Sequence, residues 1–305
     1  MSPVERIVAV VGPTASGKSD LAVGLARSLG DAEVVNADSM QLYRGMDVGT
    51  AKTPPDRRGG VPHCLLDVLD VSDPGSVAEF QRLARAAIAD CLGRGVTPIV
   101  VGGSALYVRA VIDPLDFPGT DADVRARWTA ELEKQGAPAL HAVLADRDPE
   151  AAEQILPSNG RRIVRALEVG ELTGEPFVAT MPGHTSVYPG LRMIGLDVPR
   201  DVLDERLERR VEQMWESGFV DEVKGLIAQG LEDGPTASRA LGYQQILAHL
   251  RGEMSEHEAR TATVTGTRKF ARRQDRLFRK DPRIHWLPFD SPTLVDDALA
   301  IVDAP

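Results

Sequence analysis

One stretch near the N-terminus constrains the fold more than any other feature of the sequence. It reads VVGPTASGKSDLA from Val10 to Ala22 and contains the complete P-loop pattern Gly-x-x-x-x-Gly-Lys-Ser. An apolar run at 7–11 precedes it and a helical pattern follows, which is the strand–loop–helix context that a P-loop requires. Backbone N–H groups in such a loop, together with the helix N-terminus, bind an anion. The sequence therefore predicts a polyphosphate site, without identifying a nucleotide.

The P-loop is the ATP-binding motif of many nucleotide-binding proteins, and each of its positions has an expected task. Lys18 supplies a charge for the outer phosphate, and the Ser19 hydroxyl can hold Mg²⁺. We therefore expect Mg²⁺ as a cofactor, with Ser19 as its protein ligand. The residues of the loop expected to surround the phosphates are Gly12, Pro13, Thr14, Ala15, Ser16, Gly17, Lys18 and Ser19.

Composition narrows the class of protein. A length of 305 residues suggests roughly two domains. The net charge of −10 argues, when taken alone, against nucleic acid as a partner. We expect a cytoplasmic enzyme, because no run is apolar and long enough to span a bilayer and the N-terminus lacks a signal-peptide layout. Cys64 and Cys91 have neither disulfide nor zinc spacing, so we expect buried free thiols.

Strand and helix patterns alternate in the first third of the chain. The strands are expected at 6–11, 33–37, 63–69 and 97–101, and the helices at 18–29, 76–93 and 104–112. This alternation predicts an α/β fold with a parallel sheet flanked by helices. Ligands bind beyond the carboxyl ends of such strands, where Gly12–Ser19, Asp38 and Gly102–Ser104 are expected.

The alternation of strand and helix patterns stops near Asp116. Short helical patterns without a strand fill residues 121–172, and an apolar strand returns at 191–198. We therefore expect a helical insertion domain at 118–189, inside a P-loop core formed by 1–117 and 190–305. Residues 200–280 are predicted to be mostly helical, and the chain is expected to end with a short strand, IHWLPF, and a helix near 292–303.

A carboxylate typical of ATP-hydrolysing proteins is missing from its usual place. Such proteins carry a Mg²⁺-binding Asp at the end of a second strand. The candidate strand, Pro98–Val101, ends in Gly102-Gly103-Ser104 instead. Asp38 begins a long polar segment, and Asp67 is a weaker alternative that we interpret as a strand-end carboxylate. The loop is therefore compatible with a diphosphate that is not part of ATP.

Basic residues cluster in two places despite the acidic total. Residues 268–280 hold seven Lys or Arg against one Asp. Lys269, Arg273, Arg276 and Lys280 share one helical face, which favours contact with a phosphate backbone. Arg161, Arg162 and Arg165 form a smaller group, for which a solvated face is an equally good interpretation.

Six blocks of the sequence resemble, in order and spacing, the tRNA dimethylallyltransferases, also called tRNA isopentenyltransferases. The blocks are GPTASGKS, NADSMQLYRGMDVGTAK, GGSALYVRA, NGRRIVRALEV, ASRALGYQQIL and TRKFARRQDRLFRK. The resemblance covers nearly the whole chain. It implies a P-loop NTPase-like fold and the transfer of a dimethylallyl group from dimethylallyl diphosphate to N6 of the adenine 3′-adjacent to the tRNA anticodon.

The resemblance also implies roles for individual residues. Asp38 matches the family's acid and is expected to accept the N6 proton as the new bond forms. Thr14 is expected to reach the bridging oxygen of the diphosphate. Arg206 and Arg210 lie four apart on one helix face, and we assign the diphosphate arginine to Arg210 with Arg206 beside it. The competing interpretations are a loop-capping Asp, a turn-forming Thr and a solvated helix.

We expect tRNA, through its anticodon stem-loop, to contact residues from several blocks. They are Asp38, Ser39, Met40, Gln41, Ser104, Arg125, Arg127, Arg161, Arg162, Arg165, Arg239, Tyr243, Arg272, Arg273, Gln274 and Arg276. The sequence departs from the family pattern at Ser104, where Thr is more common, and at Asn159, which replaces a frequent Asp. Arg276 and Leu277 replace a common Thr-Trp pair, which removes a stacking Trp.

Two other functions use the same features. A P-loop small-molecule kinase explains the phosphate loop but not the basic helix or the polar segment after Asp38. An RNA-binding module without transferase chemistry explains the basic helix but leaves Asp38 and Arg210 without a task. The transferase explains all of them, and we expect it to act as a monomer that makes no contact with a membrane.

Overall fold

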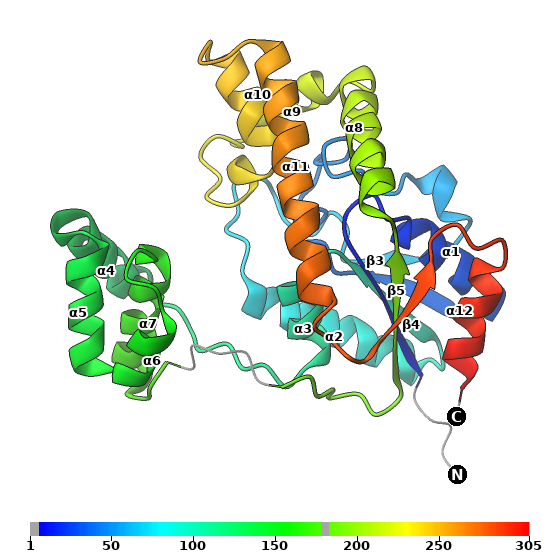
Figure 1. Cartoon of the computed structure of the whole chain (residues 1–305), viewed down its shortest axis with the longest axis horizontal. Helices are drawn as coiled ribbons and strands as arrows, with labels where there is room; N and C mark the ends of the chain where they lie inside the picture. Colours follow the sequence, from blue (N-terminus) through cyan, green and yellow to red (C-terminus); the bar gives the residue numbers. More distant parts are fainter. Residues whose placement is uncertain (1–5, 178–182, 305) are drawn as a thin grey trace. The chain divides into compact units, whose positions relative to one another are not determined.

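The computed structural model describes residues 6–177 and 183–304. The chain divides into two compact units, each described here by itself. The first comprises Met1–Pro114 and Ser186–Pro305, and the second comprises Leu115–Thr185 (Figure 1). The insertion domain was expected at 118–189. That range includes residues 178–182, which lie outside the described part of the chain.

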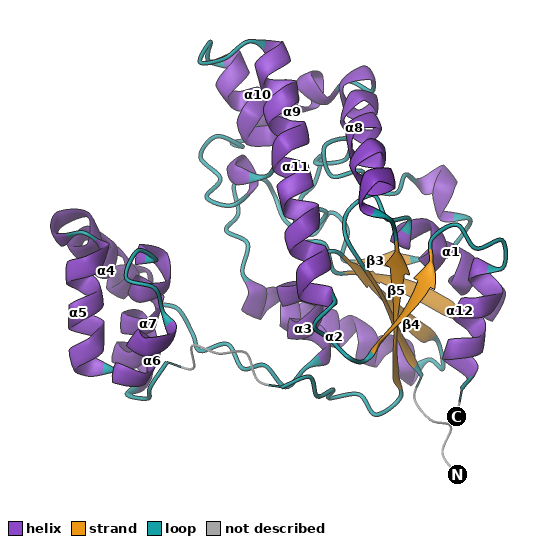
Figure 2. Ribbon diagram, in the orientation of Figure 1, coloured by secondary structure: helices purple, strands orange, loops and turns teal. Residues whose placement is uncertain are grey.

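A six-stranded parallel sheet forms the centre of the first unit (Figure 2). The order across the sheet is β3-β2-β4-β1-β5-β6. Its strands are β1 (Ile7–Val11), β2 (Ala32–Asn36), β3 (His63–Cys64), β4 (Thr97–Gly102), β5 (Leu191–Asp197) and β6 (Ile284–Pro288). The predicted α/β fold with a parallel sheet is thus confirmed.

Helices cover both faces of this sheet, because alternate residues of each buried strand point to opposite sides. Val8 and Val10 of β1 pack with α1 (Lys18–Leu29) and α12 (Leu294–Asp303). Ile7, Ala9 and Val11 pack with α2 (Val77–Gly93) and α3 (Ala105–Ile112). Both faces of β1 are apolar, as is typical of a central parallel strand.

A helical layer from the C-terminal half completes the first unit. It consists of α8 (Arg200–Glu216), α9 (Phe219–Ile227), the short η2 (Ala237–Arg239), α10 (Tyr243–Leu250) and the long α11 (Glu256–Phe278). Phe219 and Tyr243 are fully buried in its core, where their rings meet edge-on. Tyr43 and Met46, from the polar segment that follows β2, are buried in the same cluster. This layer therefore fixes the segment between β2 and β3, which also contains η1 (Pro55–Arg58).

In residues 115–177 and 183–185, the described part of the second unit, the regular elements are helices alone. They are α4 (Ala122–Gln135), α5 (Ala137–Arg147), α6 (Pro149–Gln154) and α7 (Gly160–Thr173). Trp128, Leu140, Leu144 and Ile163 are among the buried residues of a core that belongs to this unit. A separate core is what an inserted domain needs in order to fold as a compact body.

Three expectations need correction. The strand predicted at 63–69 is only the two-residue β3, since Leu65 (φ 62°) and Asp67 (φ 58°) adopt left-handed backbone conformations that end it. The Asp67 carboxylate meets Lys52 at 2.6 Å instead of ending a strand. Cys91 is buried and Cys64 is only half-buried, because Cys64 lies where the short edge strand ends.

Candidate active site

The phosphate loop joins β1 to α1, as its sequence requires. Gly12 (φ 147°) and Gly17 (φ 102°) adopt conformations that side chains disfavour, so the loop can curl tightly. The first N–H groups of α1 have no partner within the helix, so the loop presents donors to an anion. The Ser16 hydroxyl is buried and has no hydrogen-bond partner among the described residues. Together these groups form an anion site at the carboxyl end of the central strand.

The Lys18 ammonium group is partly desolvated by the protein around it. Its ammonium group donates a hydrogen bond to the Pro13 carbonyl at 3.3 Å. The pKa of Lys18 is lowered from 10.5 to about 8, chiefly by burial and then by the Arg210 cation, while the Asp38 carboxylate partly offsets both effects. Burial likewise lowers the pKa of Arg210, against the opposing effect of Asp38. Two partly buried cations, of which Arg210 lowers the pKa of Lys18, form a site that favours an anionic ligand.

Asp38 follows directly after β2, and a local network fixes it. Its backbone N–H donates to Asn36 Oδ1 at 2.9 Å, and Asn36 Nδ2 donates to the Asp38 and Leu65 carbonyls, each at 3.0 Å. One carboxylate oxygen accepts the Met40 N–H at 2.9 Å. The loop-capping interpretation is thus correct for one oxygen, while the other has no donor within the described residues and can accept a proton.

Three cavities meet around these groups. The P-loop cavity, of about 580 Å³, is lined by Lys18, Ser19 and Arg210 among others. The Asp38 cavity, of about 650 Å³, is lined by Thr14, Asp38 and Arg210 among others. A junction cavity of about 50 Å³ has walls that include Lys18, Ser19, Thr14, Asp38 and Arg210. Because all three contain Arg210 in their lining, this guanidinium lies where they meet.

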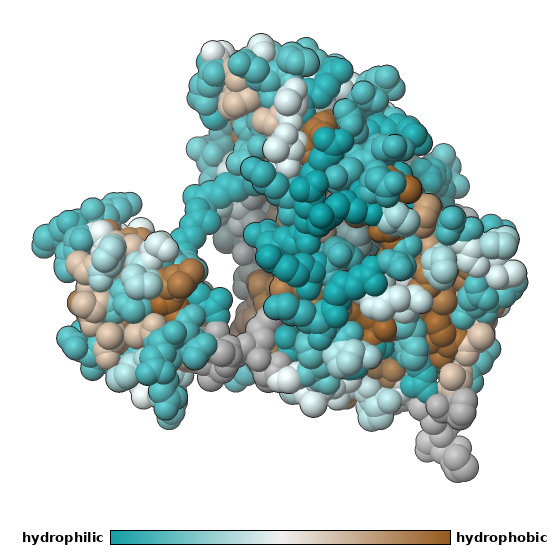
Figure 3. Space-filling model, in the orientation of Figure 1, coloured by the Kyte–Doolittle hydropathy of each residue, from teal (hydrophilic) through white to brown (hydrophobic). Residues whose placement is uncertain are grey.

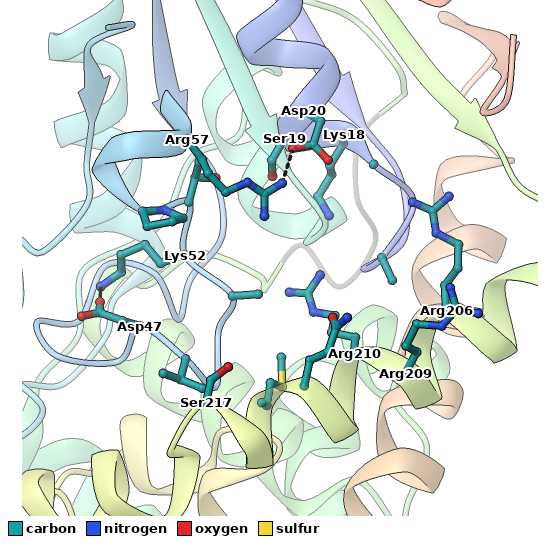
Figure 4. A pocket seen from close by; sticks show the side chains of 18 residues that line it. Lys18, Ser19, Asp20, Asp47, Lys52, Arg57, Arg206, Arg209, Arg210 and Ser217 are labelled. Atoms are coloured by element: carbon teal, nitrogen blue, oxygen red, sulfur yellow. Dashed lines mark hydrogen bonds and ion pairs between the residues drawn. The ribbon is translucent and has the colours of Figure 1, made fainter. Parts of the chain in front are cut away.

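The P-loop cavity carries more positive than negative charge. In Figure 4, Lys18, Arg57 and Arg210 point toward its middle from different elements. Arg57 pairs with Asp20 at 3.0 Å, and Lys52 pairs with Asp47 at 2.5 Å. The remaining cations of the lining have no ion-pair partner in the described part of the chain; they are Lys18, Arg206, Arg209 and Arg210. Four such cations around a loop of N–H donors suit a diphosphate.

The lining of the Asp38 cavity combines apolar side chains with cations. Met40, Leu207, Val211 and Phe270 supply the apolar surface. Many of the residues predicted to bind tRNA line this cavity: Asp38, Ser39, Met40, Ser104, Arg239, Tyr243, Arg273, Gln274 and Arg276. Gln41 lines the junction cavity instead. A cavity lined by apolar side chains, one carboxylate and several cations can hold an uncharged base that is attached to a phosphate chain.

The basic side chains of helix α11 fall into two groups, those that form ion pairs and those that line the Asp38 cavity. Arg268 and Arg272 of α11 pair with Glu208 and Asp204 of α8, and Arg279, directly after the last residue of α11, pairs with Asp197 of β5. Lys269, Arg273 and Arg276 line the Asp38 cavity and have no ion-pair partner among residues 6–177 and 183–304. Hydrophilic residues cover the surface where α11 lies in Figure 3. Three members of the predicted basic face therefore remain available to an anion.

Gln274 reaches the phosphate loop from α11. It is buried, and its Oε1 accepts the Thr14 N–H at 3.0 Å. A Cβ at Gly103 would lie 2.6 Å from the Gln274 amide nitrogen, and one at Gly102 would lie 2.4 Å from the Ala37 carbonyl oxygen. Of the two glycines that stand in place of an ATPase carboxylate, Gly103 makes room for the contact between α11 and the phosphate loop, and Gly102 makes room for Ala37 next to β2.

The remaining predicted arginines belong to the second unit. Arg125 and Arg165 pair with Glu168, a fully buried carboxylate, at 2.7 and 2.9 Å, and Arg127 pairs with Glu171. Arg161 and Arg162 are exposed at the start of α7. The ion pairs of Arg125 and Arg165 organise this unit, and the more exposed members of the group remain candidates for an RNA contact.

Several residues of the site were not predicted. Arg57 and Arg209 line the P-loop cavity, although nothing in the sequence around them marks them as anion ligands. Glu222 accepts hydrogen bonds from the backbone of residues 47–49. The one signal for it was its place in the apolar helical pattern FVDEVKGLI, where a carboxylate on a buried face needs a partner.

Comparison with known proteins agrees with this geometry. The family model described as IPP transferase matches residues 41–281, and the one described as isopentenyl transferase matches residues 5–72. A tRNA dimethylallyltransferase of Streptomyces avermitilis is 62% identical over 99% of this chain and 97% of its own. One from Thermobifida fusca is also 62% identical, over 98% and 95%.

A solved structure supports the same assignment. The full-length tRNA isopentenylpyrophosphate transferase of Bacillus halodurans is 41% identical, covers 96% of this chain and 94% of its own, and superimposes with a TM-score of 0.71. Within the described residues, no helix has the length and apolar character needed to cross a membrane. The P-loop, the two joined cavities and these similarities lead to one conclusion: the chain belongs to the tRNA dimethylallyltransferase family.

Proposed function

We propose that this chain transfers the dimethylallyl group of dimethylallyl diphosphate to N6 of the adenine 3′-adjacent to the anticodon of a tRNA and releases diphosphate. The observation that carries this proposal is the meeting of two large cavities at Arg210. One cavity is cationic and is lined by the P-loop, while the other is lined by Asp38, apolar side chains and several cations. A phosphoryl transfer to a small molecule would leave the second cavity and its cations without a task.

The diphosphate of the donor would occupy the P-loop cavity. Lys18, Arg206 and Arg210 neutralise its charge, and the loop N–H groups donate to its oxygens. Negative charge grows on the leaving oxygen as its bond to carbon breaks, so fixed cations and donors stabilise the transition state more than the bound donor. Thr14 lines the junction between the two cavities, from which its hydroxyl can approach that oxygen.

The adenine would enter the Asp38 cavity after leaving its stack in the RNA loop. The N6 lone pair attacks the first carbon of the dimethylallyl group, the new C–N bond forms, and the C–O bond to diphosphate breaks. The electron pair of that bond leaves with the diphosphate. The free carboxylate oxygen of Asp38 accepts the proton that N6 loses, which prevents a positive charge from remaining on the amine.

Mg²⁺ fits this site as a partner of the diphosphate. The Ser19 hydroxyl lines both the P-loop and junction cavities and has no hydrogen-bond partner in the described ranges. No group of three acidic, His or Cys side chains in the described residues could hold a metal by itself. Mg²⁺ commonly takes few protein ligands and shares phosphate oxygens and water. Ser19 would therefore hold the ion, which supplies charge neutralisation for the leaving diphosphate.

The RNA backbone would lie along the rim of the Asp38 cavity. Lys269, Arg273 and Arg276 of α11 and Arg239 of η2 provide the cations there. These charges attract phosphate without reading a base, so they position the RNA while the cavity selects the adenine. Arg161 and Arg162 of the second unit offer a further contact to the same molecule.

The proposal is tested by the mass of the product. The purified chain is incubated with dimethylallyl diphosphate, Mg²⁺ and a tRNA that carries adenine 3′ to its anticodon, and digested nucleosides are analysed by mass spectrometry. We expect one adenosine to gain the mass of a dimethylallyl group in place of a hydrogen, and a tRNA with guanine at that position to stay unchanged. If the adenosine stays unmodified and the chain instead transfers phosphate from ATP to a small alcohol, the proposed function is wrong and the chain is a kinase.

A further inference from the structure

Glu222 of α9 lines none of the three cavities, and its carboxylate accepts four hydrogen bonds. One oxygen accepts the backbone N–H groups of Asp47 and Val48, at 3.0 and 2.6 Å. The other accepts the Gly49 N–H at 3.2 Å and the Tyr243 hydroxyl at 2.6 Å. A single side chain thus binds three successive N–H groups of a segment that lies more than 170 residues earlier in the sequence.

The packing around this turn leaves it little freedom. A Cβ at Gly49 would lie 2.1 Å from the Phe219 ring and 2.6 Å from the Tyr243 ring, so only glycine fits against them. Phe219 and Tyr243 are fully buried, with ring centroids 4.9 Å apart. Three N–H groups converging on one anion form the kind of concave site that fixes a backbone conformation. Glu222 therefore holds residues 47–49 in one arrangement against a rigid aromatic pair.

The turn leads directly to Arg210. The next carbonyl group, that of Thr50, accepts Arg210 Nη2 at 3.2 Å and Gln41 Nε2 at 3.2 Å. The Thr50 hydroxyl donates to the Met46 carbonyl at 2.6 Å and closes the same turn. Within the described residues this carbonyl is the hydrogen-bond partner of the Arg210 guanidinium. The direction of the guanidinium in the junction between the cavities thus depends on where the turn places one oxygen atom.

We propose that Glu222 is a positioning residue for the transfer reaction, acting through the 47–50 turn and the Thr50 carbonyl on Arg210. This inference rests on the proposed function, because only there does Arg210 have a task at the diphosphate. A guanidinium displaced by about 1 Å can reduce a rate by about a hundredfold even when substrates still bind. Without the carboxylate, three N–H groups have no acceptor, the turn relaxes, and the Thr50 carbonyl no longer orients Arg210.

The first test compares two neighbouring carboxylates of α9. Glu222→Gln keeps the size of the side chain but turns an amide N–H toward donors, so it should disturb the turn. Asp221→Asn is the matched control, because Asp221 is exposed and its ion-pair partner among the described residues is Lys224, at 3.1 Å. We expect Glu222→Gln to lower the single-turnover rate by about 10- to 100-fold while tRNA affinity changes less than about twofold. Asp221→Asn should change neither.

A double-mutant cycle separates positioning from general structural damage. In an Arg210→Ala background, Glu222→Gln should change the rate by less than about threefold, because the group through which it acts is gone. Tyr243→Phe removes one of the four hydrogen bonds and provides a milder variant for the same cycle if Glu222→Gln folds poorly. Circular dichroism and urea unfolding check the fold of each variant.

The outcomes are distinct. An equal loss of rate in the wild-type and Arg210→Ala backgrounds would overturn the positioning role and leave Glu222 a purely structural residue. A loss of tRNA affinity in place of rate would overturn it as well. A wild-type chain that modifies no adenosine would instead contradict the proposed function itself, and the cycle would then have no reaction to report.

Discussion

At the scale of single residues, the site depends on one carboxylate with two different oxygens. Asp38 uses one oxygen to accept the Met40 N–H and leaves the other in the Asp38 cavity. The first oxygen fixes the orientation of the carboxyl group, and the second can accept a proton. A residue that was expected either to cap a loop or to act as a base can therefore do both.

Asp38→Asn should separate these two tasks. The amide oxygen can still accept the Met40 N–H, so the loop keeps its shape, while most of the basicity is removed. A positioned base contributes roughly 10²- to 10⁴-fold in rate, and we expect single-turnover transfer to fall by about that factor. Affinities for tRNA and donor should change by less than about tenfold. A near wild-type rate, or full recovery when Mg²⁺ is raised, would contradict the role of Asp38 as a base.

Lys18 should make donor binding depend on pH. The pKa of Lys18 is lowered to about 8, chiefly by burial, so its ammonium group loses its proton as the pH rises through that value. The diphosphate then meets one positive charge fewer, and its dissociation constant should rise by about tenfold per pH unit. Calorimetric titrations from about pH 7 to about pH 9.5 measure this slope. Lys18→Arg keeps its charge throughout that range and should bind with a flat profile.

At the scale of elements, α11 connects the Asp38 cavity to the phosphate loop. One helix carries Arg273 and Arg276 at the Asp38 cavity, Gln274 on the Thr14 N–H, and Arg272 on Asp204 of α8. Adjacent positions therefore have different partners, since each residue of a helix is rotated by about 100° from the one before it. The charges on α11 are not equivalent, although the sequence presents them as one cluster.

This difference can be measured as a salt dependence. Each cation removed from the RNA phosphates should reduce the slope of log affinity against log salt by about 0.7 to 0.9. We expect Arg273→Gln with Arg276→Gln to reduce the slope for tRNA by about 1.4 to 1.8, with little change in donor affinity. Arg272→Gln, on the same helix, is the control, because Asp204 already neutralises that guanidinium. Equal slopes in all variants would mean that the RNA docks elsewhere.

At the scale of the whole molecule, the chain forms two units with separate hydrophobic cores, and the three cavities belong to one of them. All three cavities are lined by residues of the first unit. The core of the second unit contains Trp128, Leu140 and Leu144, and none of these contributes to a cavity wall. Donor binding should therefore be a property of the first unit, whatever the second contributes to the RNA.

A cavity-forming substitution tests this division. Leu144→Ala, at a position that is 1% exposed, should destabilise the second unit by about 2–5 kcal/mol. Hydrogen exchange should increase in α4, α5 and α7, while the affinity for dimethylallyl diphosphate remains unchanged. Leu156→Ala is the control within the same unit, because Leu156 is 71% exposed and its truncation should cost less than about 0.5 kcal/mol. Weaker donor binding by Leu144→Ala alone would show that the two units are coupled.

Features that depend on near neighbours follow from the sequence alone. The P-loop, the alternation of strands and helices, and the start of α1 at Lys18 reflect residue types within a few positions of one another. The strand pattern at 63–69 was wrong because Leu65 and Asp67 take backbone conformations that their local pattern did not indicate. At 65–67, tertiary contacts such as the Lys52–Asp67 ion pair outweighed local preference.

Which charged residues share a site depends instead on tertiary packing. The sequence placed Arg272 with Arg273 and Arg276, but packing against α8 gives Arg272 an acidic partner and leaves the other two at a cavity. The pattern FVDEVKGLI indicated that Glu222 needs a partner, but not that this partner is the 47–49 turn, because these positions are more than 170 residues apart. Local preferences act over one or two turns of chain, whereas the partner of a buried charge is chosen by the packing of whole elements, which brings distant residues within hydrogen-bond reach.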